Sequence, residues 1–128
     1  METLTTHDIT ISVETEYLAG HSNPREGKFI FGYHITIENG SPYTVQLLRR
    51  HWVIRDATGV MREVEGEGVV GLQPVLGPGE VHGYSSFCNL DTEIGQMSGE
   101  YLMTRLEDGS FFDAGIPEFR MVAPFKMN

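Results

Sequence analysis

Residues 28–38 read Lys-Phe-Ile-Phe-Gly-Tyr-His-Ile-Thr-Ile-Glu, and this stretch indicates the fold most clearly. Aromatic or branched apolar side chains recur at every second position, at Phe29, Phe31, Tyr33, Ile35 and Ile37. A period of two residues places such side chains on one face of a β-strand. The stretch therefore predicts a strand that buries one face.

The same pattern recurs on both sides of this strand, separated by turn signals. Toward the N-terminus, Ile9, Ile11 and Val13 alternate with polar residues and predict a strand, and residues 21–27 supply a turn. Toward the C-terminus, Asn-Gly-Ser-Pro at 39–42 ends the central stretch. We expect further strands over residues 45–56, 60–65, 80–87, 96–106 and 110–122, the last one bulged or broken at Ile116-Pro117.

The strand expected over residues 45–56 has two candidate faces. One would hold Leu48, Arg50, Trp52 and Ile54, and the other Leu47, Arg49, His51 and Val53. We assign the tryptophan face to the core, because a large aromatic side chain is stabilised most by burial. Trp52 would pack there with Phe29, Phe31, Tyr33 and Tyr101.

Many short strands, frequent turns and no period of 3.6 residues predict an all-β fold. We expect an immunoglobulin-like or fibronectin type III-like antiparallel β-sandwich of about seven strands, which the pattern favours over a barrel. One domain would span residues 1–128.

The charge and the cysteine content limit the binding partners and the cellular compartment that we expect. Eighteen acidic residues against nine basic ones give a net charge of −9, which opposes binding to nucleic acid or to an anionic membrane. The N-terminus has no basic and apolar export segment, and no stretch approaches the roughly 18 apolar residues of a membrane span. The single cysteine, Cys88, precludes an intrachain disulfide, so we expect a cytoplasmic protein.

Several motifs in the chain resemble those of bacterial ApaG proteins. They occur in order over almost the whole chain, at residues 23–27 (Asn-Pro-Arg-Glu-Gly), 50–52 (Arg-His-Trp), 66–74, 76–80, 88–92 and 97–101. The resemblance implies a fibronectin type III-like sandwich of two antiparallel sheets, a domain that also occurs as an interaction module inside larger proteins. It implies no established reaction.

Residues 66–79 contain five glycines and two prolines and are expected to form mostly loop, with at most a short β bridge. Their first six residues match the pattern GxGxxG, but Pro74 and Pro78 exclude the helix that a dinucleotide-binding fold requires. Backbone N–H groups of a glycine loop can still bind phosphate without a helix. One hypothesis is therefore a pyrophosphate site made of Gly66, Gly68, Gly71, Arg49, Arg50 and Arg62.

The alternative is plain turn geometry. In that case the arginines would form cross-strand salt bridges with Glu63, Glu65 and Glu67 on a solvated sheet face.

The remaining reactive residue types form no recognisable motif. The five histidines, at positions 7, 21, 34, 51 and 82, show neither HxH nor HExxH spacing, so no metal site is predicted. Ser85, Ser86 and Cys88 lack a glycine elbow and a base tied to them in sequence. We expect no catalytic residue and no cofactor, and we expect Cys88 to be a small buried residue.

Two functions are consistent with these patterns. The first is a non-enzymatic module that binds a protein partner through a sheet face or through its loops. The second is a binder, less readily a hydrolase, of pyrophosphate- or nucleotide-polyphosphate-containing ligands through residues 66–71. The sequence identifies neither the partner nor the ligand.

Overall fold

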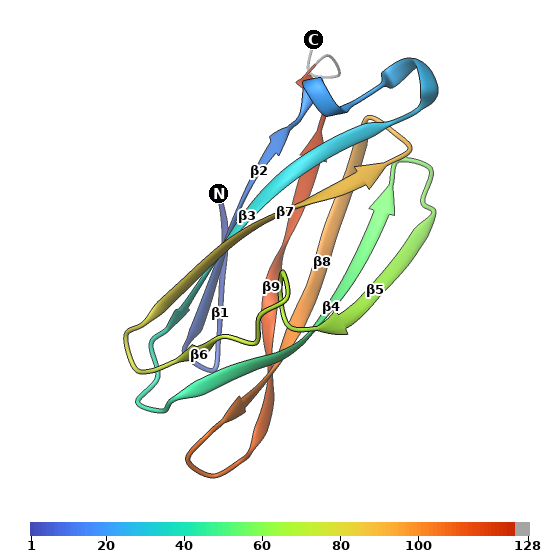
Figure 1. The fold of residues 1–128 in the computed structure, drawn as a ribbon. Coiled ribbons are helices and arrows are strands. Elements are labelled where there is room, and N and C mark those ends of the chain that lie inside the picture. The colour runs from blue at the N-terminus through green and yellow to red at the C-terminus, as the bar shows by residue number, and fades with distance from the viewer. Residues whose placement is uncertain (125–128) are drawn as a thin grey trace.

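Two antiparallel β-sheets pack face to face in the computed structural model, which describes residues 1–124 (Figure 1). The first sheet has the order β1-β2-β3-β7, with β1 (Glu2–Thr6), β2 (Ile9–Tyr17), β3 (Phe29–Asn39) and β7 (Val81–Leu90). The second has the order β5-β4-β8-β9, with β5 (Met61–Glu67), β4 (Val45–Asp56), β8 (Ile94–Arg105) and β9 (Phe111–Val122), and β6 (Val75–Leu76) also pairs with β4. The predicted antiparallel sandwich is confirmed.

The core lies between the sheets and contains the alternating apolar residues of β3 together with buried side chains from the strands of both sheets. Phe29, Phe31, Tyr33 and Tyr101 are all buried, as expected. Trp52 is only 3% exposed, and its ring meets Tyr33 edge-on at 5.5 Å and Phe119 at 5.9 Å between centroids. Such edge-to-face aromatic pairs add to the stabilisation from burial itself.

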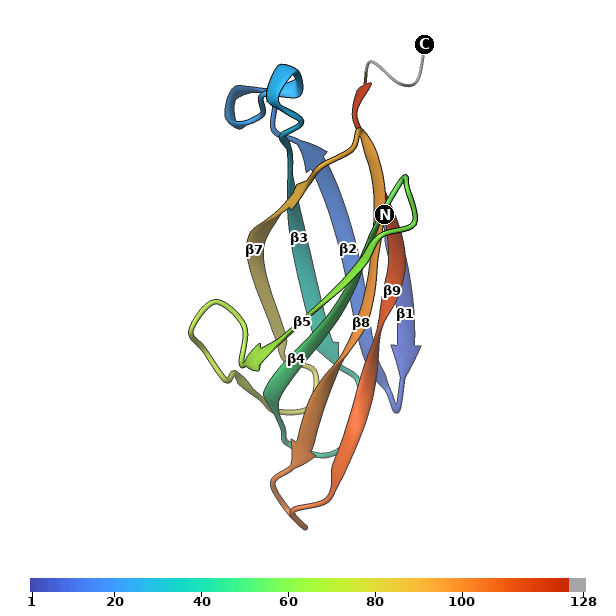
Figure 2. The same ribbon diagram turned by 90° about the vertical axis from the view of Figure 1, so that its right-hand side faces the viewer.

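All seven predicted strands are present, and residues 1–124 form two more. β6 is the short bridge expected in the glycine-rich segment, whereas β1 had not been predicted, because its sequence offers only Leu4 as a large apolar side chain. β1 pairs with β2 and packs against β9, which closes one side of the sandwich (Figure 2). Two 3-10 turns, Ala19–His21 and Pro24–Glu26, connect β2 to β3.

A β-bulge in β4 changes which residues face the core. Leu47 pairs with Met103 but Arg49 pairs with Leu102, so Leu48 is an extra residue in β4. Leu47, before the bulge, and Trp52, after it, both face inward and are buried. The prediction that Leu48 shares the core face with Trp52 is therefore wrong, because strict alternation cannot continue through an inserted residue.

A second bulge lies where Ile116-Pro117 predicted an irregularity. Met97 pairs with Phe119 and Gly99 with Ile116, so β9 has one residue more than β8 in this interval. Proline has no N–H for the ladder, and a bulge is a position that tolerates this loss. The strand is bulged rather than broken.

No helix among residues 1–124 has the length and apolar character needed to cross a membrane. Residues 125–128 lie outside the described part of the chain, so a single domain over all of residues 1–128 stays a prediction.

Candidate functional site

The glycine-rich loop after β5 folds into a small hairpin. Val69 and Leu72 exchange two backbone hydrogen bonds of 2.7 and 3.0 Å, and Val70 and Gly71 form the turn between them. Both turn residues have positive φ, 46° and 77°, as a type I′ turn requires. At the base of the hairpin, the Gly68 N–H donates to the Leu48 carbonyl at 2.8 Å. Three N–H groups of the loop are thus donated to carbonyls of the chain itself.

Arg50 forms hydrogen bonds to the backbone of this loop from the inner side of the sheet. Its guanidinium donates to the carbonyls of Glu67 and Gly68, at 3.0 and 3.1 Å. A Cβ atom added at Gly66 would lie 2.8 Å from the Arg50 guanidinium. Gly66 therefore provides the space that the arginine occupies.

The other predicted phosphate-binding residues lie apart from this contact. Arg62 donates to the Asn89 carbonyl and to the Cys88 sulfur, linking β5 to β7. Arg49 lies on the opposite face of the sheet from Arg50, because neighbouring residues of a strand point in opposite directions. The structure thus brings Gly66, Gly68 and Arg50 together, but not Arg49 or Arg62, and phosphate binding stays a prediction.

The tip of the hairpin is apolar and exposed. Val70 is 64% exposed and Leu72 is 57% exposed. The hairpin projects from the side of the sandwich after the end of β5 (Figure 2). Val70 is also a β-branched residue with positive φ, a conformation that such residues rarely adopt and that costs free energy.

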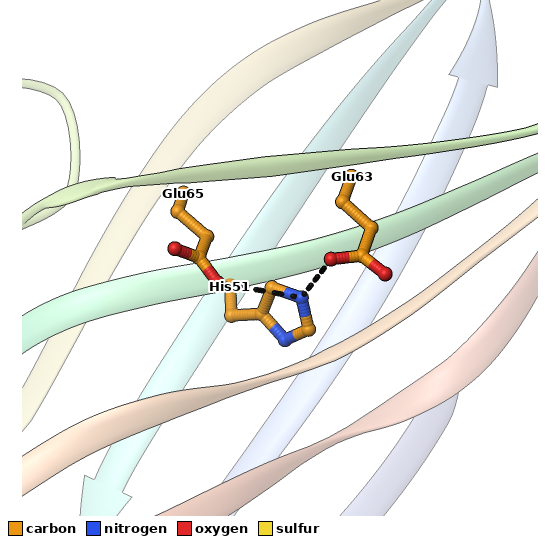
Figure 3. A group of neighbouring side chains, drawn as sticks. All are labelled: His51, Glu63 and Glu65. Atoms are coloured by element: carbon orange, nitrogen blue, oxygen red, sulfur yellow. Dashed lines mark hydrogen bonds and ion pairs between the residues drawn. The ribbon is translucent and has the colours of Figure 1, made fainter.

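A second cluster occupies the outer face of β5, β4 and β8. His51 Nδ1 lies 2.7 Å from Glu100 Oε1, and His51 Nε2 lies 3.3 Å from Glu63 Oε2 and 3.8 Å from Glu65 Oε1. In Figure 3 the two carboxylates approach the ring from the neighbouring strand. The hydrogen bond to Glu100, followed by that to Glu63, raises the pKa of His51 above its usual value.

This cluster was not predicted from the sequence, which placed no metal ligands here. Within residues 1–124, the ion pairs of Glu63 and Glu65 are with His51, so the expected arginine salt bridges to these two glutamates are not formed. The signal that could have found the cluster is the alternation of Glu63 and Glu65 on the strand that pairs with His51.

One serine does meet a histidine, on the outer face of the first sheet. Ser85 Oγ lies 2.9 Å from His34 Nδ1. Within the described residues no carboxylate forms a hydrogen bond with the His34 ring to orient it, as the third member of a catalytic triad would. Cys88 is buried as expected, and this burial raises the pKa of its thiol, which opposes formation of a nucleophilic thiolate.

Comparisons with known proteins agree with the motifs. A family model described as the ApaG domain matches residues 19–105. A protein of Azotobacter vinelandii named Protein ApaG is 47% identical over 92% of this chain and 93% of its own length, and one of Thiobacillus denitrificans with the same name is 51% identical over 92% of each. These names state no reaction.

Solved structures show the same relationship. A Bordetella pertussis protein whose crystal structure was solved under the name ApaA superimposes with a TM-score of 0.88 at 39% identity, covering 91% of this chain and 94% of that one. The C-terminal domain of wzt has a TM-score of 0.56 at 10% identity over 95% of this chain and 77% of that one, and it shares the fold alone. The matched domain, the sequence identity and the common sandwich together place this chain in the ApaG family.

Proposed function

We propose that the chain is a non-enzymatic protein-interaction module and that the hairpin tip around Val70 is its docking element. The observation that carries this proposal is the combination of strain and exposure at Val70. Glycine or asparagine would adopt the positive φ at this position with little or no strain. A valine there costs on the order of 1–3 kcal/mol, and most of its side chain stays exposed in the free protein.

Burial against a partner would supply a stabilising contact for the Val70 side chain that the free protein lacks. Covering a valine side chain fully is worth about 1.5–3 kcal/mol, which is comparable with the strain. The strand leading into the hairpin carries exposed glutamates at positions 63, 65 and 67. The partner that fits is therefore a protein with an apolar groove beside basic side chains.

The test separates stability from binding. We expect Val70→Asn to raise the free energy of unfolding, because it relieves strain, and to lose the partner that the wild type retains stoichiometrically in affinity purification from the native cell. Val60→Asn is the matched control, since Val60 is 65% exposed but has no positive φ. If Val70→Asn retains the same partner, or if Val60→Asn loses it equally, the docking proposal is wrong.

The pyrophosphate alternative has one feature in its favour, the two consecutive positive-φ residues at the hairpin tip. It stands second because the N–H groups of Gly68, Val69 and Leu72 and the guanidinium of Arg50 already donate to carbonyls of the chain. Calorimetric titration with pyrophosphate at low and physiological salt tests it directly. We expect no binding heat at millimolar ligand, and a salt-sensitive affinity that Gly68→Val abolishes would instead support the alternative.

A further inference from the structure

The outer-face cluster places three metal-ligating atoms together through backbone register. Glu63 and Glu65 alternate on β5, so both side chains emerge on the same face, and Glu65 is paired directly with His51 on β4. His51 Nε2 and one carboxylate oxygen from each glutamate all lie within 4.8 Å of one another. The strand pairing itself, rather than a flexible loop, brings the donors together (Figure 3).

The separations suit a small divalent ion. Zinc binds imidazole nitrogen and carboxylate oxygen at about 2.0–2.2 Å, so two ligands of a tetrahedral ion lie about 3.3–3.6 Å apart. The distance from His51 Nε2 to Glu63 Oε2 is 3.3 Å, and that to Glu65 Oε1 is 3.8 Å. Glu65 is an exposed side chain, and a small rotation would bring its oxygen within the tetrahedral separation from His51 Nε2.

Glu100 distinguishes this arrangement from a patch of acidic residues. It lies directly across from His51 on β8, with its Oε1 2.7 Å from His51 Nδ1. A carboxylate that accepts the Nδ1–H of a neutral imidazole leaves the Nε2 lone pair free for a metal, on the side where Glu63 and Glu65 lie. Histidine ligands of metal ions are commonly held by such a carboxylate.

We propose that His51, Glu63 and Glu65 bind a divalent transition-metal ion of the zinc class, with Glu100 as the residue that positions the His51 ring. Two ionised carboxylates neutralise the ion, and the imidazole favours a transition metal over Mg²⁺, which prefers oxygen ligands. Three protein ligands leave a coordination position open to water or to a group from another molecule.

Calorimetric titration of the metal-stripped protein with Zn²⁺ tests the proposal. We expect one ion per chain, and we expect His51→Gln, Glu63→Gln and Glu65→Gln each to weaken binding at least about tenfold. Glu67→Gln is the matched control, because Glu67 lies two residues beyond Glu65 on the same face and strand but is paired with Arg49 rather than His51. Its affinity should equal that of the wild type.

Glu100→Ala and the ring signals of His51 provide a second readout. Loss of the positioning carboxylate should weaken Zn²⁺ binding about 10- to 100-fold. In the wild type, NMR should show Zn²⁺ bound to His51 Nε2 with the proton on Nδ1. The proposal is overturned if Zn²⁺ shifts another histidine instead, if Glu67→Gln weakens binding as much as Glu65→Gln, or if Mg²⁺ binds as tightly as Zn²⁺.

Discussion

Trp52 and His51 are neighbours in β4, yet they belong to environments that share almost nothing. Trp52 is packed among aromatic rings between the sheets, whereas His51 lies among three glutamates on the outer surface. Successive side chains of a β-strand point to opposite faces of the sheet, so two neighbouring residues can lie in such different environments. The side chains on the inner face of β4 therefore stabilise the fold through burial. Polar side chains on its outer face can form a cluster with little effect on the free energy of unfolding.

Truncating the inner member of this pair should have the largest effect. We expect Trp52→Ala to lower the free energy of unfolding by about 3–5 kcal/mol, because the deletion leaves a cavity between the sheets. Urea unfolding measures this, with His51→Ala as the control, for which the loss should be well under half as large. Equal losses for the two variants would contradict the division of β4 into two roles.

Gly99 tests the backbone between the two faces. It pairs with Trp52 across the ladder, and a Cβ atom added there would lie 2.0 Å from the His51 carbonyl oxygen. Since the clash is with backbone, we expect Gly99→Ala to cost about 1–3 kcal/mol in urea unfolding.

Gly20 gives the control for this substitution, because nothing lies within 4 Å of a Cβ atom added there and its φ is not positive. We expect Gly20→Ala to change the free energy of unfolding by less than about 0.5 kcal/mol. If Gly99→Ala behaves in the same way, the close approach of β8 to β4 is not a constraint.

A polar contact inside the sandwich gives a smaller effect with a distinct pH dependence. The hydroxyls of Tyr84 and Tyr101 lie 2.5 Å apart, and Tyr84→Phe should cost about 1 kcal/mol at neutral pH. Burial raises the pKa of both tyrosines. Above about pH 10 the unfolded chain therefore loses tyrosine protons that the folded protein keeps, and stability falls as pH rises.

Unfolding measured between pH 9 and 11.5 checks this behaviour. In Tyr84→Phe the decline should be shallower, because one of the buried groups that retain a proton in the folded protein is gone. An unchanged slope would mean that Tyr84 ionises normally.

Substitution of His51 on the outer face of β4 should have the smallest effect on the free energy of unfolding. With a chelator present, His51→Gln should cost no more than about 1 kcal/mol, as expected for an exposed ion pair. The hydrogen bonds to Glu100 on β8 and to Glu63 on β5 raise the pKa of His51, so the charged ring stabilises the fold below about pH 6.5 and this contribution is lost as pH rises through the folded-state pKa. A difference from wild type that grows with pH would contradict this sign.

The same contrast explains what the sequence could predict. The period-two pattern of β3 has one physical cause, burial against the other sheet, and it determined the sandwich and the core around Trp52. The His51 cluster depends on which residues are paired across β5, β4 and β8, and register is invisible in a single strand. The core face of β4 was assigned wrongly at Leu47 and Leu48 for a related reason, since no residue type marks the bulge.

That bulge also gives Leu48 a position unlike any other in its strand. Its carbonyl accepts hydrogen bonds from the Gly68 N–H and the Gln73 side chain, so the extra residue is where the hairpin loop is attached to the sheet. Removing Leu48 would restore regular alternation without turning any other side chain to the opposite face, whereas a deletion elsewhere in β4 would invert part of the strand. We therefore expect a chain that lacks Leu48 to keep the other core residues of β4 on their faces and to lose the hydrogen bonds by which the Leu48 carbonyl holds the loop to the sheet.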